Sequence, residues 1–271
     1  EVRTIASSLG GMRFKNLVTD RDGTVNNYCG RYRSSVQPAY NAVFLARYAG
    51  QVEIPVLLTS APLRDFGLVD ISVLPGGCFV YAGSKGREYL TRRGEYRTFP
   101  VDHEKQEMLD RLNSRLEELL STPEYQVYGL IGSGLQFKFG QTTVSRQDIN
   151  HSIPDQESVL FLNVVKNLVR DLDPDRSYFR IEDTGMDVEV ILTIQDPGRP
   201  GELKDFDKGD GIRFLARELG MGLSQGPNLV CGDTRSDIQM VRTSVEATGE
   251  TWAVFVSDDK SLRETLQKEC P

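Results

Sequence analysis

Apolar residues occur along this chain in two alternating kinds of run. Short continuous runs, such as Phe14–Thr19 and Ile54–Thr59, are typical of strands that are buried on both faces. Longer stretches with apolar residues three and four positions apart, such as Ala39–Ala49, predict amphipathic helices. Near the end the alternation returns, predicting helices at Gly211–Leu219, Asp233–Val245 and Asp259–Gln267 and strands at Asn228–Cys231 and Trp252–Val256. This order indicates an α/β fold with a parallel sheet.

The middle of the chain has a different pattern. Long amphipathic helices are predicted at Glu104–Leu120 and Ser158–Leu172, and hairpin strands at Gln126–Ile131, Leu135–Val144 and Tyr178–Thr193. Strands and helices grouped in this way are typical of an α+β module. We therefore expect an α/β domain formed by residues 1–93 and 201–271, with an α+β domain inserted at 94–200. The polar linkers near 92–97 and 197–205 are expected to act as hinges.

Composition narrows the class of protein. The 271 residues carry a net charge of −7, with a pI near 5.1 and no basic stripe, which argues against a nucleic acid as partner. No apolar run is long enough to cross a membrane and no signal peptide is visible, so we expect a cytoplasmic protein without a membrane partner. Free thiols are expected at Cys29, Cys78, Cys231 and Cys270. The chain begins at Glu1 rather than Met, which is compatible with a piece of a longer protein.

Acidic residues follow two of the predicted strands. In "NLVTDRDGTVNN" Asp20 and Asp22 come directly after an apolar run, and in "LVCGDTRSDIQMV" Asp233 and Asp237 follow another. Ligands of open α/β sheets bind beyond the carboxyl ends of the strands, so the four acids are expected to converge there. Four carboxylates in one cleft would repel one another, and Mg²⁺ with its preference for oxygen ligands would relieve that repulsion.

Two further segments complete a set of groups suited to phosphoryl transfer. "VLLTSAP" places the hydroxyls of Thr59 and Ser60 after a strand, and "DKGDGIRFL" places Lys208 before a helix. A carboxylate nucleophile, a hydroxyl, a lysine and a metal ion supply the positioning and charge neutralisation that phosphoryl transfer needs. Taken singly, each segment also fits an acidic turn, a helix cap, a hydroxyl turn or a solvated lysine.

The four motifs occur in one order: D-x-D-G-T, a Thr-Ser after an apolar strand, K-G before a helix, and G-D-x-x-S-D-x-x-M. In this order the chain resembles a haloacid dehalogenase superfamily phosphatase. The insertion between the second and third motifs resembles the C2 type of cap. The cap segment "DVEVILT" is similar to that of trehalose-6-phosphate phosphatases, and "TDRDGTVNNYCGRYRSSVQPAYNAV" looks most like the nematode type.

This resemblance implies a role for each residue of the motifs. Asp20 would be the nucleophile, and Asp22 would be the general acid and base. Thr59, or Ser60 in its place, would bind the phosphate, and Lys208 would balance its charge. The resemblance implies that Mg²⁺ is held by Asp20, the backbone carbonyl of Asp22, Asp233 and Asp237.

The cap would supply the sugar contacts. Glu189 matches the family's sugar-contacting glutamate, and Gln136, Lys138 and Arg146 are further candidates. The chain departs from the family at Ala61, where an arginine often stands, so Arg64 is the candidate for that arginine's role.

The function expected on these grounds is Mg²⁺-dependent hydrolysis of a sugar phosphate, with trehalose 6-phosphate as substrate, through an aspartyl-phosphate. The alternatives are a phosphatase for sucrose phosphate or a mannosyl-phosphoglycerate, a mutase, and a sugar-phosphate-binding module without turnover. The sequence predicts no oligomeric state.

Overall fold

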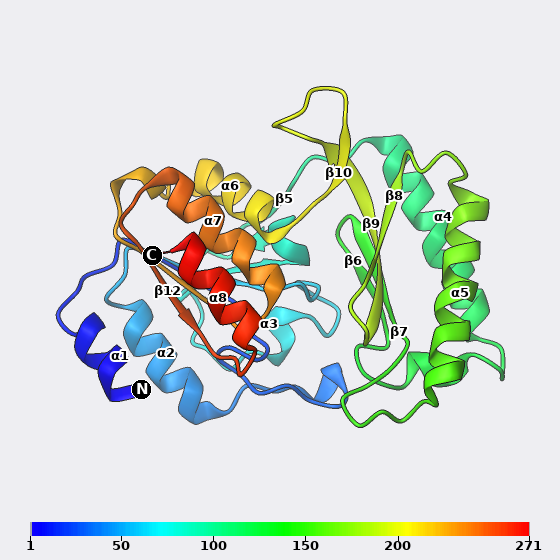
Figure 1. The fold of residues 1–271 in the computed structure, drawn as a ribbon, viewed down its shortest axis with the longest axis horizontal. Helices are drawn as coiled ribbons and strands as arrows, with labels where there is room; N and C mark the ends of the chain where they lie inside the picture. The colour runs from blue at the N-terminus through cyan, green and yellow to red at the C-terminus, as the bar shows by residue number, and fades with distance from the viewer. Residues whose placement is uncertain (1, 271) are drawn as a thin grey trace.

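The computed structural model describes residues 2–270, which form two bodies side by side, each built on one β-sheet (Figure 1). The body around the first sheet is called the core below, and the body around the second sheet is called the cap. Among residues 2–270, no helix is both long and apolar enough to span a bilayer.

The core sheet has β1 near its centre, between β11 and β2. Its strands are, in spatial order, β12 (Thr251–Phe255), β11 (Asn228–Gly232), β1 (Asn16–Thr19), β2 (Ile54–Leu58), β3 (Val80–Gly83), β4 (Glu88–Leu90) and β5 (Tyr96–Thr98). The strands from β12 to β3 are parallel, whereas β4 and β5 run antiparallel to their neighbours. The expected α/β class is therefore confirmed, with an antiparallel edge added to the parallel sheet.

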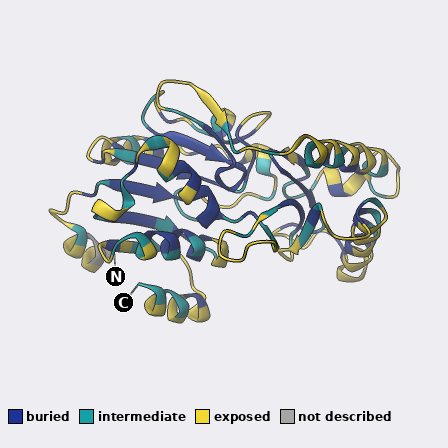
Figure 2. Cartoon of the chain, turned by 90° about the horizontal axis from the view of Figure 1, so that it is seen from above, coloured by how far each residue is buried: buried dark blue, intermediate teal, exposed yellow. Residues whose placement is uncertain are grey.

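Helices cover both faces of the core sheet, because successive side chains of a strand point to opposite faces. Leu17 and Leu57 pack on the side of α2 (Ala39–Ala49) and α3 (Leu68–Ile71). Their neighbours Val18 and Val56 pack on the side of α6 (Lys208–Leu219) and α7 (Ile238–Ala247). The central strands β1, β2, β3 and β11 are accordingly buried over most of their length, and the outer faces of the helices are exposed (Figure 2). Helices α1 (Val2–Leu9) and α8 (Lys260–Glu269) complete the core.

The cap sheet lies between the core and a pair of long helices, α4 (His103–Leu120) and α5 (Asp155–Leu172) (Figure 1). Its strands are β10 (Leu203–Asp205), β9 (Asp187–Gln195), β7 (Gln141–Ser145) and β6 (Leu135–Lys138), and β8 (Phe179–Asp183) pairs with β9 as well. Val144, Val188 and Val190 pack against Leu112 and Phe161 of the helices. The alternate residues are polar and lie on the other face of the sheet, toward the core.

One predicted strand is wrong. Gln126–Ile131 was expected to be extended, but Gln126–Gly129 forms a 3₁₀ helix, η3. The ring of Tyr128 stacks on Phe161 with 3.7 Å between centroids, and its hydroxyl donates to the carbonyl of Glu157 at 3.1 Å, so this segment is held against α5. Its alternation of apolar and polar residues is typical of a strand, but no neighbouring strand pairs with it.

The expected domain boundaries, 93/94 and 200/201, are each displaced by a few residues. β5 still belongs to the core sheet, because Thr91–Glu95 forms a tight turn that returns the chain beside β4. β10 still belongs to the cap sheet, because it pairs with the end of β9. The segments expected to be hinges are thus largely hairpins, and the chain crosses between the sheets at 99–102 and 206–207.

Candidate active site

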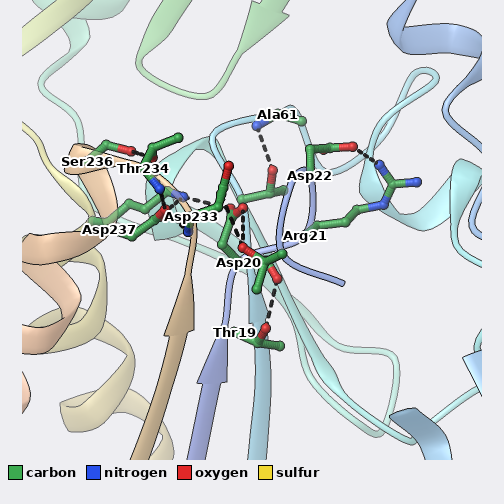
Figure 3. A network of polar contacts seen from close by, with 12 residues as sticks. Thr19, Asp20, Arg21, Asp22, Ala61, Asp233, Thr234, Ser236 and Asp237 are labelled. Atoms are coloured by element: carbon green, nitrogen blue, oxygen red, sulfur yellow. Dashed lines mark hydrogen bonds and ion pairs between the residues drawn. The ribbon is translucent and has the colours of Figure 1, made fainter. Parts of the chain in front are cut away.

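Three neighbouring strands of the core sheet end in the polar residues of the predicted motifs. Asp233 follows β11, Asp20 follows β1 and Thr59 follows β2. The strands are parallel, so these residues meet at one edge of the sheet. Figure 3 shows Asp20 and Asp233 beside each other there. All three side chains are buried or nearly so.

Lys208 joins the nucleophile candidate to the fourth motif. It is the first residue of α6, and its Nζ donates hydrogen bonds to Oδ1 of Asp20 at 2.7 Å and to Oδ1 of Asp237 at 2.5 Å. The second oxygen of Asp237 accepts hydrogen bonds from the backbone N–H groups of Asp233 and Thr234. Asp237 is therefore both the cap of a helical turn and a fixed counter-ion of Lys208.

Asp233 is held by two hydroxyl groups. Thr24 donates to its Oδ1 at 3.1 Å and also lies 3.4 Å from Oδ2 of Asp20, while Tyr28 donates to its Oδ2 at 2.6 Å. Gly23 has φ +86, and a Cβ atom at this position would overlap Oδ2 of Asp233. Glycine is thus required both by the backbone conformation and by the carboxylate beside it.

The charges of the site are not balanced by protein groups. Burial raises the pKa of Asp20 to about 7; Lys208 acts in the opposite direction, and the neighbouring carboxylates add to the rise. Burial would lower the pKa of Lys208, but Asp20 and Asp237 hold it above its usual range. The pKa of Asp233 is raised as well, chiefly by burial. The site thus has one ammonium group for three closely spaced carboxylates.

These carboxylates fit a divalent cation. One oxygen from each of Asp20, Asp233 and Asp237 can be chosen so that all lie within 4.8 Å of one another. Three ionised carboxylates beside one lysine leave an excess of two negative charges. Oxygen ligands and this excess charge suit Mg²⁺.

The carboxylate of Asp22 lies outside this cluster and faces the opposite direction (Figure 3). Its Oδ1 forms an ion pair with the buried guanidinium of Arg21 and accepts a hydrogen bond from the Ser35 hydroxyl at 3.0 Å. Burial raises the pKa of Asp22, although Arg21 and Ser35 partly counteract this effect. Asp22 is therefore a carboxyl group with an enhanced affinity for a proton, fixed beside the cluster.

The hydroxyl candidates after β2 differ in burial. Thr59 is buried, and its Oγ1 accepts a hydrogen bond from the backbone N–H of Ala61 at 3.2 Å, which leaves the hydroxyl proton free to be donated. Ser60 is half-buried beside it. Arg64 is exposed, and its guanidinium lies 4.5 Å from the centre of the Tyr96 ring. The structure thus places Arg64 against β5.

The cap candidates divide into two groups. Glu189 and Lys138 are buried on the polar face of the cap sheet and pair at 3.4 Å, and Gln136 is buried on the same face. Arg146, in contrast, forms an ion pair with Asp183 at 2.8 Å and donates to the hydroxyl of Ser158. Its hydrogen bonds are therefore made within the cap.

Sequence reasoning missed three polar residues of this region. Thr24 could have been found as the threonine of D-x-D-G-T, whereas Tyr28 and Lys85 carry no motif signal. Lys85 lies between β3 and β4 and pairs with Glu189.

A cavity of about 690 Å³ lies away from this site, between the crossing segments and α6. Its lining does not include Asp20, Asp22, Asp233 or Asp237.

A parallel sheet with an acidic cluster at its carboxyl edge, joined to an α+β cap, defines the class: the haloacid dehalogenase fold with a C2-type cap. The C-terminal domain of Candida albicans trehalose-6-phosphate phosphatase has a similar fold, with a TM-score of 0.59 and 14% identity over 90% of this chain and 78% of that one. The family model "Trehalose-6-phosphate phosphatase, C-terminal" matches residues 17–271. The chain belongs to this family.

Two curated relatives show how much of longer proteins the chain represents. It is 34% identical to the trehalose-phosphatase of Brugia malayi, covering 93% of this chain and 51% of that protein. It is 31% identical to "Alpha,alpha-trehalose-phosphate synthase [UDP-forming] 1" of Aphelenchoides avenae, covering 95% of this chain and 22% of that protein. The chain therefore spans about half of one relative and about a fifth of the other.

Proposed function

We propose that this chain is a phosphatase that releases phosphate from a sugar phosphate, with trehalose 6-phosphate as its substrate. The observation that carries the proposal is the bridge from Lys208 to Asp20 and Asp237, with Asp233 alongside, at the edge of the core sheet. Family membership supports the choice of sugar, as does the similarity to a relative named trehalose-phosphatase. In this proposal the core carries the chemistry and the cap binds the sugar.

Asp20 is the proposed nucleophile. One of its oxygens attacks phosphorus, the bond between phosphorus and the ester oxygen breaks, and the phosphoryl group is carried as an aspartyl-phosphate. Water then attacks phosphorus and releases inorganic phosphate and free Asp20. Lys208 holds Asp20 in place and offsets the negative charge that accumulates beside it.

Asp22 is the proposed general acid and base. In the first step its proton goes to the sugar oxygen that leaves, and in the second step it takes a proton from the attacking water. Its burial favours the protonated form that the first step needs. In the structure Arg21 and Ser35 hold this carboxyl group on the side away from Asp20, so the proposed proton transfer requires the side chain of Asp22 to turn toward the cluster. The hydroxyl of Thr59 is free to donate a hydrogen bond to a phosphoryl oxygen.

Mg²⁺ is the proposed cofactor, held by Asp20, Asp233, Asp237 and the backbone carbonyl of Asp22. When bound there, it would neutralise charge on the phosphoryl oxygens and keep Asp20 ionised. On the cap side, Glu189, Lys138 and Gln136 present acceptors and donors to sugar hydroxyls.

The test is phosphate release from a panel of sugar phosphates, with and without EDTA. We expect release from trehalose 6-phosphate, its loss in EDTA and its recovery with Mg²⁺. Asp20→Asn should lower the rate by at least a thousandfold, since it removes the nucleophile. Release that persists in Asp20→Asn would contradict the mechanism, and preference for another sugar phosphate would contradict the substrate.

The second candidate is a sugar-phosphate-binding module without turnover. The observation that favours it is the similarity of this chain to about a fifth of relatives named as synthases. Calorimetric binding of trehalose 6-phosphate without phosphate release from wild-type protein would support this candidate.

A further inference from the structure

The segment between β3 and β4 connects the catalytic edge of the core to the polar face of the cap. The ammonium group of Lys85 lies 2.7 Å from Oε2 of Glu189 on β9 and 3.0 Å from Oε2 of Glu182 on β8. Glu182 and Glu189 are paired residues of these two neighbouring strands. One lysine of the core therefore spans two strands of the cap.

The backbone of Lys85 is hydrogen-bonded to the core, whereas its side chain pairs with the cap. Its N–H donates to the carbonyl of Thr59 at 2.9 Å, and the N–H of Ser84 donates to the carbonyl of Ala61 at 2.7 Å. On the other side, α6 approaches so closely that a Cβ on Gly211 would overlap the carbonyl oxygen of Lys85. Lys85 itself has φ +60, a left-handed conformation that costs energy in a residue other than glycine.

The electrostatics of Glu189 depend on this contact. Glu189 is 6% exposed, and burial alone would raise its pKa, but Lys85 and then Lys138 lower it to about 2. Lys85 is the nearer of the two lysines, at 2.7 Å against 3.4 Å for Lys138. Glu182 is 45% exposed, so water can replace Lys85 as its partner. Glu189 is buried, so water cannot take the place of Lys85 beside its carboxylate.

We propose that Lys85 is a positioning residue, which holds the carboxylate of Glu189 at one place opposite the catalytic edge, so that the sugar part of the substrate meets a fixed acceptor. The proposal rests on the proposed function for the identity of that substrate. Because the backbone N–H of Lys85 also donates to the carbonyl of Thr59, this one residue links Thr59 of the core to Glu189 of the cap. Without Lys85, the ion-pair partner of Glu189 would be Lys138, at 3.4 Å.

The kinetic test compares two substrates in wild-type protein and in Lys85→Met. Trehalose 6-phosphate has hydroxyl groups for Glu189 to bind, whereas the leaving group of p-nitrophenyl phosphate has none. We expect KM for trehalose 6-phosphate to rise about 10- to 100-fold, since a hydrogen bond to a charged group is lost. The loss in kcat/KM for p-nitrophenyl phosphate should be at least fivefold smaller. Equal losses in kcat/KM for both substrates would overturn the proposal. They would mean that Lys85→Met disturbs the phosphate-binding side of the site, through the hydrogen bond of Lys85 to Thr59, and not the contact with the sugar.

A double-mutant cycle shows whether Lys85 acts through Glu189. In a Glu189→Gln background, Lys85→Met should cause no further rise in KM, whereas independent effects would multiply and overturn the proposal. Lys105→Met is the matched control, because Lys105 bonds only to Thr193 of the cap. In this variant the ratio of kcat/KM for trehalose 6-phosphate to kcat/KM for p-nitrophenyl phosphate should be the same as in wild type.

A readout without turnover separates this proposal from the proposed function. The same cycle is measured in EDTA, where no turnover is expected, as binding of trehalose 6-phosphate by calorimetry and as urea unfolding. Lys85→Arg is used if Lys85→Met does not fold. Tighter binding in wild type than in the variant, with coupling between positions 85 and 189, supports the positioning role even if no phosphate is released. The proposal would be overturned if the changes in unfolding free energy at positions 85 and 189 were additive, or if wild type and Lys85→Met bound trehalose 6-phosphate with equal affinity. Wild-type protein that releases no phosphate contradicts the proposed function alone.

Discussion

Gly23 has room for only a hydrogen atom on the side that faces Asp233. Its φ is +86, and the overlap that a Cβ would make is with a carboxylate oxygen of the proposed metal site. Two causes of damage are therefore combined at this position: a strained backbone and a displaced ligand. A matched pair of substitutions can separate them.

Gly23→Ala is expected to weaken Mg²⁺ binding by about 10- to 100-fold, because Asp233 must move away from Asp20. Isothermal titration calorimetry with Mg²⁺ measures this effect. Gly94→Ala is the control, since Gly94 has φ +83 but no atom within 4 Å of the Cβ position. Alanine strains the backbone at both positions, so both variants should be less stable than wild type. Only Gly23→Ala should also lose Mg²⁺ affinity. Equal Mg²⁺ affinity in both variants would show that Asp233 does not bind the ion.

The residues of the core site could be predicted from sequence because each stands at a fixed offset from a strand end or a helix start. Asp20, Thr59, Lys208, Asp233 and Asp237 all lie at the expected edge of the sheet. Their proposed roles are a separate matter, which the experiments above address. The ion pair of Lys85 with Glu189 could not be predicted, since its members are 104 positions apart, one in the connection between β3 and β4 of the core and the other on β9 of the cap.

At the scale of elements, the first turn of α6 places Lys208 and also packs against the segment that carries Lys85. Gly211 makes this close approach possible, since its Cα meets Gly86 and the carbonyl of Lys85. A helix interior normally prefers alanine to glycine by up to about 1 kcal/mol. Here the packing outweighs that preference.

Gly211→Ala is therefore expected to lower the free energy of unfolding by about 2 kcal/mol, through overpacking against backbone atoms. Urea denaturation followed by circular dichroism measures it. In the control Gly50→Ala, the new methyl group lies at the end of α2, 3.4 Å from the carbonyl of Arg47, and φ is −66. The control should stay within about 0.5 kcal/mol of wild type. A stabilised Gly211→Ala would mean that the backbones of α6 and of the Lys85 segment leave room for a methyl group.

Elements differed in how well the sequence predicted them. The buried strands β1, β2 and β11 and the long helices α4 and α5 have strong periodicity, and their predicted bounds lie within a few residues of those observed. The edge strand β5 was missed because its three residues are polar and largely exposed, so its pairing leaves no apolar pattern. The segment of the 3₁₀ helix η3 has the alternation of a strand, and local alternation does not reveal whether a neighbouring strand is there to pair with it.

At the scale of the whole molecule, Arg87 is the main polar link between core and cap apart from Lys85. It is 1% exposed, and its guanidinium donates to the carbonyls of Gly140 at 2.5 Å and Leu192 at 2.6 Å, on two cap strands or their turns. Burial lowers the pKa of Arg87 to about 9, with Asp210 and Asp205 acting in the opposite direction. A planar group with several donors suits this double contact better than an ammonium group does.

Arg87→Lys is expected to destabilise the protein by about 3 kcal/mol, because one charge-assisted hydrogen bond is lost at a buried site. Amide hydrogen exchange should become faster in β7 and β9, where the cap meets the core. The control is Arg92→Lys, since Arg92 also donates to two carbonyls, those of Gly77 and Glu53, but is exposed and contacts only the core. Unchanged exchange in Arg87→Lys would show that the cap is held by other contacts.

The pairing of β1 with β11 has a consequence for how the protein is made. Asn16 lies beside Asn228 in the centre of the core sheet, so this pairing closes a loop of more than two hundred residues that contains the whole cap. During synthesis, the five core strands β1 to β5 emerge before β11, which must be inserted next to β1. The nascent polypeptide therefore has an open, apolar sheet edge from the synthesis of β1 until β11 has emerged, and the acidic cluster of Asp20, Asp233 and Asp237 assembles only after that.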